Sequence, residues 1–108
     1  LAAMNYDEIN QACAEELGYT NISIVCWRGH LNGIETRIPY FPTDANATLT
    51  LIEYLKKAGW RVSLSTETEG VYCCAANAGV PVLVQVIYDT FQRAVCIAFL
   101  KAVGRYRE

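Results

Sequence analysis

Apolar residues recur every three or four positions in three segments of the 108-residue chain, a spacing that predicts three amphipathic helices. The segments cover about residues 6–17, the stretch between Asp44 and Gly59, and about residues 91–103. A side chain that can accept from free backbone N–H groups precedes each segment: Asn5 with Glu8 as its capping-box partner, Thr43 or Asp44, and Thr90. In the second helix we expect the main apolar stripe to be Leu49, Ile52 and Leu55.

Runs of β-branched, aromatic or alternating apolar residues predict about five strands between these helices. We place them at Ile22–Trp27, Ile34–Ile38, Trp60–Ser65, Val71–Ala76 and Val82–Ile87. Asn32-Gly33 and Glu67–Gly70 are typical of the turns that join neighbouring strands. The order α-β-β-α-β-β-β-α therefore predicts a single α+β domain, with a mainly antiparallel sheet of about five strands packed with three helices.

Two segments carry more apolar surface than this arrangement covers. The expected strand Val82–Ile87 is almost continuously apolar, which is typical of a strand covered on both faces. The last helix is apolar nearly all round, and three short helices hardly cover both faces of five strands. Because large exposed apolar patches mark interfaces, we expect a homo-oligomer.

Composition and charge limit the classes of partner. The formal net charge is −2, which does not provide the basic face that DNA or RNA binding requires. No apolar run approaches the roughly 20 residues of a membrane-spanning helix, and no signal peptide follows Met4. We interpret Leu1-Ala2-Ala3 as an expression-vector remnant and expect one domain at 4–108 in a cytoplasmic protein without a membrane partner.

No set of residues indicates a catalytic or metal site. The five cysteines are odd in number and lack metal-ligand spacing. The only histidine, His30, follows Gly29 in an expected turn, where we interpret it as a solvated side chain. Walker loops, dinucleotide fingerprints and nucleophile elbows are absent from the sequence. We therefore expect no enzyme, no metal and no cofactor.

An unusual cation marks the start of the last helix. Arg93 lies in the first turn after Thr90, where the helix dipole disfavours positive charge. Free N–H groups at a helix start bind phosphate, and a guanidinium adds a planar fork for its oxygens. Gln92 and Arg93 are therefore candidate residues for holding a small anion.

Four further residues are candidate companions of this anion site. Arg37 precedes a loop in which Tyr40 and Phe41 can stack on a base, and Asn77 can contact a base edge from a turn. A plainer interpretation remains open for each position. Arg93 can pair with Asp89 across one turn, and Tyr40 or Phe41 can belong to the core.

From Met4 onward the chain resembles the phage ABA-sandwich family of small phage proteins. The segments that carry the resemblance are Tyr6–Asn10, Glu16–Tyr19, Ile38–Ala45, Leu55–Trp60 and Arg93–Ala102. In element order and size the chain is also similar to the phage Thoeris anti-defence proteins that act as nucleotide sponges. That similarity implies an oligomer with an arginine-and-aromatic pocket between protomers, which sequesters a cyclic ADP-ribose-type nucleotide without cleaving it.

The residues and the resemblance together predict a phage anti-defence protein that binds a small cyclic nucleotide. The alternative is an inhibitor that acts by protein contact, such as an anti-CRISPR protein with an acidic surface that mimics nucleic acid. Glu67, Glu69 and the first helix supply only a modest acidic patch for that role. A phosphodiesterase is the third and weakest hypothesis.

Overall fold

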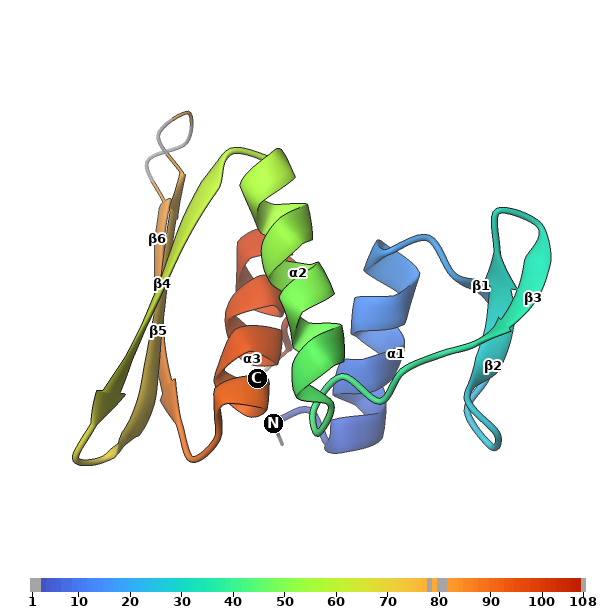
Figure 1. The fold of residues 1–108 in the computed structure, drawn as a ribbon, viewed down its shortest axis with the longest axis horizontal. Helices are drawn as coiled ribbons and strands as arrows, with labels where there is room; N and C mark the ends of the chain where they lie inside the picture. The colour runs from blue at the N-terminus through green and yellow to red at the C-terminus, as the bar shows by residue number, and fades with distance from the viewer. Residues whose placement is uncertain (1–2, 78, 80–81, 108) are drawn as a thin grey trace.

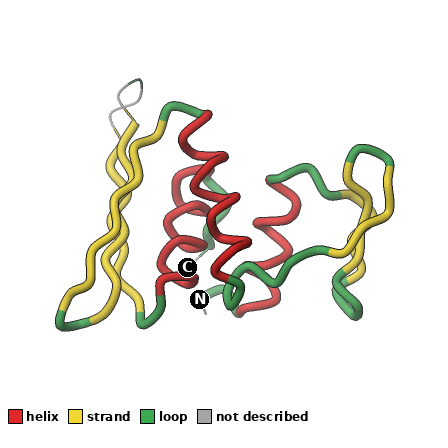
Figure 2. The backbone as a smooth tube through the Cα atoms, viewed as in Figure 1, coloured by secondary structure: helices red, strands yellow, loops and turns green. Residues whose placement is uncertain are grey.

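Three helices lie between two antiparallel three-stranded sheets (Figures 1 and 2). The computed structural model describes residues 3–77, 79 and 82–107. The elements are, in order, α1 (Tyr6–Glu16), β1 (Thr20–Ser23), β2 (Arg28–Leu31), β3 (Ile34–Arg37), α2 (Ala45–Lys57), β4 (Trp60–Glu67), β5 (Gly70–Asn77), β6 (Val82–Tyr88) and α3 (Phe91–Val103). The predicted α+β class is confirmed, whereas the single sheet of about five strands is wrong.

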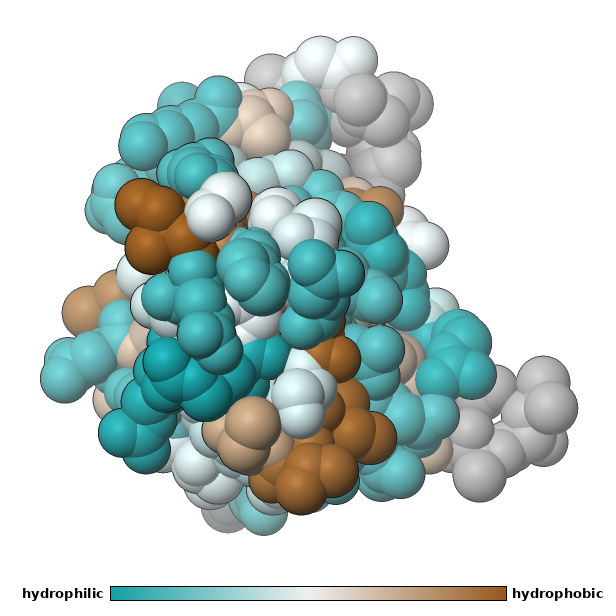
Figure 3. All heavy atoms as spheres, turned by 90° about the vertical axis from the view of Figure 1, so that its right-hand side faces the viewer, coloured by the Kyte–Doolittle hydropathy of each residue, from teal (hydrophilic) through white to brown (hydrophobic). Residues whose placement is uncertain are grey.

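The first sheet, with strand order β1-β2-β3, contains the main error of the sequence prediction. The expected strand Ile22–Trp27 is instead the end of β1, a turn, and the approach to β2. Asn21 and Trp27 have φ angles of 50° and 51°, a left-handed conformation that interrupts an extended run. Viewed from the side on which the first sheet lies, the surface is mostly hydrophilic with separate hydrophobic patches (Figure 3). The exposed large hydrophobic residues of this sheet and its turns are Ile24, Val25 and Ile34.

The second sheet has the order β4-β5-β6 and is covered by helices on one face (Figure 1). In β6, Val84 and Val86 are 7% and 6% exposed and face the helices. Leu83 and Ile87 on the other face are 58% and 43% exposed. The expectation that both faces of this strand are covered is therefore wrong within one chain.

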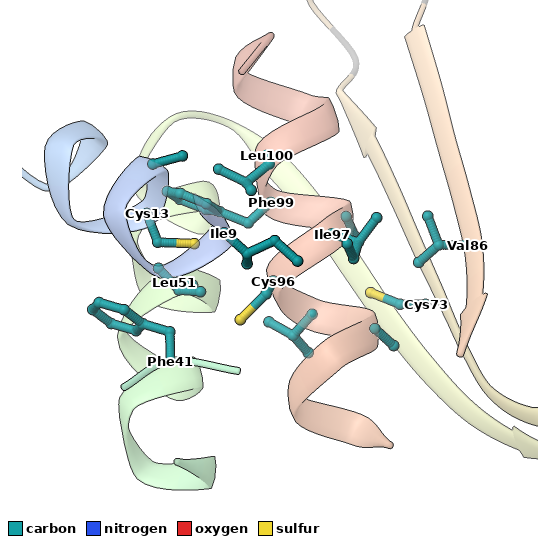
Figure 4. Close-up of a cluster of buried hydrophobic side chains, with 14 of the residues drawn as sticks. Ile9, Cys13, Phe41, Leu51, Cys73, Val86, Cys96, Ile97, Phe99 and Leu100 are labelled. Atoms are coloured by element: carbon teal, nitrogen blue, oxygen red, sulfur yellow. The ribbon is translucent and has the colours of Figure 1, made fainter. Parts of the chain in front are cut away.

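The α3 helix forms the centre of the core. Every residue from Ala94 to Leu100 is at most 1% exposed, because this helix lies between the second sheet and the other two helices (Figure 4). Its apolar circumference is thus covered within the chain. That half of the argument for an oligomer no longer holds, and only the outer face of the second sheet still supports it.

All three helices begin at the same end of the molecule, as the colour gradient of Figure 1 shows. Their predicted N-caps are confirmed: the side chains of Asn5, Asp44 and Thr90 accept from Glu8, Ala47 and Arg93 N–H groups. In α2 the predicted stripe is rotated from the true one, since Leu49 is 51% exposed while Leu51 and Leu55 are buried. The packing of α2 against α3 and β4 therefore decides which face of α2 is buried.

Polar contacts fix the loop before α2 and the C-terminal tail to α1. The buried Asn10 Oδ1 accepts from the backbone N–H of Phe41 at 2.7 Å. Glu16 accepts from the Tyr54 hydroxyl of α2 and from Arg105 Nε of the tail, the latter at 2.6 Å. Burial raises the pKa of Glu16, but these two hydrogen bonds outweigh it and lower that pKa below its ordinary value of 4.5.

Replacing Asn10 with alanine tests the link between α1 and the loop. The substitution leaves the buried N–H of Phe41 without its acceptor, so we expect a loss of about 1–3 kcal/mol in the free energy of unfolding. Urea denaturation of N10A beside N46A, at an exposed asparagine of α2, measures the difference. Equal midpoints for the two variants would contradict the inferred role.

Replacing Glu16 with glutamine tests the pH dependence of the tail contact. Because folding lowers the pKa of Glu16, its carboxylate stabilises the fold fully above 4.5 and loses that effect as the pH falls through the lower folded value. We expect E16Q to melt below the wild type at neutral pH, with a gap that narrows in acid. The control is E69Q, at an exposed glutamate in the β4–β5 turn. A gap that is constant from neutral to acid pH would show that the ionised form contributes nothing.

Candidate functional site

The predicted anion site at the start of α3 is held by its cap. Thr90 Oγ1 accepts from the Arg93 N–H at 3.2 Å, which places Arg93 in the first helical turn. Since α1, α2 and α3 begin side by side at one end (Figure 1), the positive ends of three helix dipoles point the same way. The dipoles favour an anion at this end, where the chain's own carboxylates Asp7, Glu8 and Asp44 also lie.

The Arg93 guanidinium lies over two tyrosine rings. Its Cζ is 5.3 Å from the ring centre of Tyr6, the first residue of α1, and 5.2 Å from that of Tyr88, the last residue of β6. Two cation–π contacts hold the group in place without using its N–H donors. The structure thus gives Arg93 a fixed position between the ends of two other elements.

The donors of Arg93 are only partly used. Its Nη1 is 3.7 Å from Asp89 Oδ1, so the pairing anticipated from the sequence is present. The Asp89 side chain is 68% exposed, and a surface pair of this kind contributes little. Arg93 Nε is buried and has no hydrogen-bond partner among the described residues. The covered Nε cannot reach a ligand, but the Arg93 side chain as a whole is 34% exposed, so part of it is accessible to an anionic oxygen.

A surface hollow of about 550 Å³ lies between the first sheet and the start of α2. Trp27, Arg37 and Tyr40 are among its lining residues. The rings of Trp27 and Tyr40 meet edge to face, with centres 5.7 Å apart and planes at 67°. An exposed guanidinium beside two aromatic rings is suited to a planar, negatively charged ligand.

Tyr40 connects this hollow with the Arg93 site. Its hydroxyl donates to Asp7 Oδ1 at 2.7 Å, and Asp7 follows Tyr6 in the first turn of α1. Burial, and then the Asp7 carboxylate, raise the pKa of Tyr40 to about 12, so the hydroxyl keeps its proton at neutral pH. We call the set Trp27, Arg37, Tyr40, Tyr6, Arg93 and Tyr88 the arginine–aromatic strip.

The structure brings together only some of the predicted site residues. Arg37 and Tyr40 line one hollow, and Arg93 is linked to them through α1. The stacking role expected of Phe41 is wrong, because its side chain is 1% exposed in the core and its N–H is bound by Asn10. Gln92 lies half-buried in the first turn of α3.

Asn77 lies away from the strip. It ends β5, six residues beyond the Val71 that pairs with Tyr88, so about 20 Å of strand separates them. Its Oδ1 accepts from the Gly79 N–H and its Nδ2 donates to Ala58 O, so the amide fixes a turn. Within one chain Asn77 does not belong to the same site as Arg93.

Tyr6, Trp27 and Tyr88 are strip residues that were not among the candidates from the sequence. Local signals existed: Tyr6 opens a capped helix, and Tyr88 stands two residues before the Thr90 cap. The contact of Tyr6 with Arg93 depends on the packing of α1 against α3, which local sequence does not encode. His30 was also misplaced, since it lies in β2 and not in a turn.

Two classes of site find no support in the part of the chain that the structure describes. No group of three or more His, Cys, Asp or Glu side chains there is arranged to hold a metal ion. Nor does any described helix have the length and apolar character needed to cross a membrane.

The fold is shared with a known phage protein. No family model and no curated protein matches the chain. Among solved structures, the chain is similar to a phage protein from Bacillus cereus ATCC 14579, known from a 2.0 Å crystal structure. The TM-score is 0.79 with 18% sequence identity, over 100% of this chain and 95% of that protein. At this identity the similarity shows that the two proteins share a fold.

Proposed function

We propose that this chain is a phage anti-defence protein that binds and sequesters a cyclic ADP-ribose-type signalling nucleotide without cleaving it. The observation that carries the proposal is the partly exposed Arg93 side chain, whose guanidinium lies over Tyr6 and Tyr88 at the start of α3. The phage origin is supported by the shared fold with the Bacillus cereus phage protein.

The strip matches the chemistry of a nucleotide in two parts. A phosphate gains from the helix N-terminus and from the charge-assisted hydrogen bonds of Arg93. A base gains from aromatic surface, which Trp27 and Tyr40 supply beside Arg37. The hollow of about 550 Å³ is within the size range of small-molecule sites.

Binding without cleavage follows from the same residues. Arginine, tryptophan and tyrosine side chains bind and orient a ligand, whereas hydrolysis needs a nucleophile or an activated water. Tyr40 is held protonated, since its hydroxyl donates to Asp7 and its pKa is about 12. Sequestration therefore suits the strip better than a phosphodiesterase reaction does.

Contacts of the C-terminal tail weaken the alternative of a nucleic-acid mimic. Glu8 is 2.6 Å from Arg107, and Glu16 is 2.6 Å from Arg105. Arg105 also lies 3.7 Å from Glu15, so two arginines of the tail offset part of the negative charge of α1. The acidic patch expected from the sequence is smaller for this reason.

Replacing Arg93 with alanine tests the proposal. We expect calorimetry to show binding of a cyclic ADP-ribose isomer by the wild type and at least tenfold weaker binding by R93A, a loss of about 1.4 kcal/mol or more. R93K keeps the charge but loses the planar fork, so its affinity falls between the two. R61A, at an exposed arginine of β4, serves as the matched control. The proposal fails if no isomer gives heat or a thermal shift with the wild type.

Tryptophan fluorescence tests whether the base occupies the hollow. The chain has two tryptophans, so W60F leaves Trp27 as the only reporter. We expect the nucleotide to change the emission of W60F and to leave that of W27F unchanged. Emission that responds only in W27F would show that the ligand does not bind in the hollow.

Recovery of intact nucleotide after heat denaturation of the complex distinguishes sequestration from hydrolysis.

A further inference from the structure

The second sheet has two free edges that differ in character. Among the residues that the structure describes, its strand order β4-β5-β6 leaves β4 and β6 each unpaired on one side. β4 carries Arg61 and Glu67, charges that typically protect an edge from pairing with another chain. β6 has the sequence Val-Leu-Val-Gln-Val-Ile-Tyr and carries no charge. An uncharged apolar edge of seven residues is ready to pair with another strand.

The sequence of β6 is self-complementary about its central residue. In an antiparallel pair of two β6 strands centred on Gln85, Leu83 of each copy faces Ile87 of the other, and Val84 faces Val86. The first pair lies on the outer face, where Leu83 is 58% and Ile87 is 43% exposed. The second lies on the face already buried against the helices. Every apolar side chain from 83 to 87 therefore meets one of similar shape and hydrophobicity.

We propose that β6 pairs antiparallel with β6 of a second copy of this chain, so that two three-stranded sheets become one continuous sheet. Self-pairing about a single residue requires a two-fold axis, and a closed two-fold dimer uses the same surface from both copies. A strand from an unrelated protein has no reason to match both faces of β6 in this register. The partner is therefore a second copy.

Pairing of two β6 strands accounts for the uncharged composition of β6. Gln85 is the polar residue at the centre of β6, and two neutral glutamines tolerate each other across the axis. An edge-to-edge contact of this length buries less than the roughly 800 Å² per partner of a standard interface. We therefore expect dimerisation that depends on protein concentration. The inference stands independently of the proposed ligand, because its test measures mass without a nucleotide.

A lysine at the two-fold axis tests this inference. Q85K places two positive charges directly opposite each other, which opposes pairing. The matched control is S63K, because Ser63 and Gln85 flank Cys74 in the same row of the sheet, one on each edge strand. Light scattering after size exclusion, over a series of concentrations, should give the wild type and S63K twice the mass of the 12.0 kDa chain. Q85K should give the mass of one chain, with unchanged circular dichroism.

Several results would overturn the inference. They are a wild type that stays monomeric at every concentration, a Q85K protein that keeps the dimer mass, and an S63K protein that dissociates, which would place the contact on β4. Hydrogen exchange of the wild type provides a second measurement that does not depend on the folding of Q85K. Amides of β6 should exchange more slowly as the concentration rises, and exchange independent of concentration contradicts the pairing.

Discussion

The burial of the central part of α3 is the constraint on which the rest of the structure depends. From Ala94 to Leu100 no side chain is more than 1% exposed, so the helix needs apolar partners on every side. The second sheet covers one side and α1 and α2 cover the others (Figure 4). Phe99 meets Tyr54 of α2 edge to face at 5.5 Å, which ties the two helices together. The core is thus organised around one helix, and each other layer is positioned by its contact with α3.

Cysteine contributes to this packing as a small apolar residue. Cys13 of α1 and Cys96 of α3 are both fully buried between their helices. Contact with the Cys96 thiol, together with burial, strongly raises the pKa of Cys13, so the thiolate form is suppressed. The close approach of α1 to α3 also brings Tyr6, about two turns before Cys13, next to Arg93.

Local signals predicted the helices well, because a cap and a glycine stop act within one turn. The first sheet was predicted only in part, since the strand expected at Ile34–Ile38 matches β3. Its other two strands were misjudged because they are only four residues long and Asn21 and Trp27 take positive φ. The apolar stripe of α2 was misjudged because Leu49 and Leu51 are equally apolar, and only the tertiary arrangement decides which of them is buried. Propensity therefore fixed where α2 lies in the sequence but not how it is rotated.

The candidate site shows the same division between local and tertiary information. Arg93 could be identified from its place after Thr90, whereas the choice between Tyr40 and Phe41 could not be made from two adjacent aromatics. Asn10, 31 positions away, binds the Phe41 N–H, and the Phe41 ring is buried while Tyr40 remains beside the hollow. Asn77 was grouped with Arg93 on chemistry alone, and the direction of β5 separates them.

Strand β6 shows how one short segment can serve the core and the surface at once. Because side chains alternate along a strand, Val84 and Val86 pack towards α3, whereas Leu83 and Ile87 lie exposed on the outer face of the sheet. At its end Tyr88 lies over Arg93, two residues after the last of these inward valines. Because β6 leads directly into the cap of α3, the packing of its valines also positions the first turn of α3, which contains Arg93. The cation is therefore positioned by the same hydrophobic contacts that hold the sheet on the core.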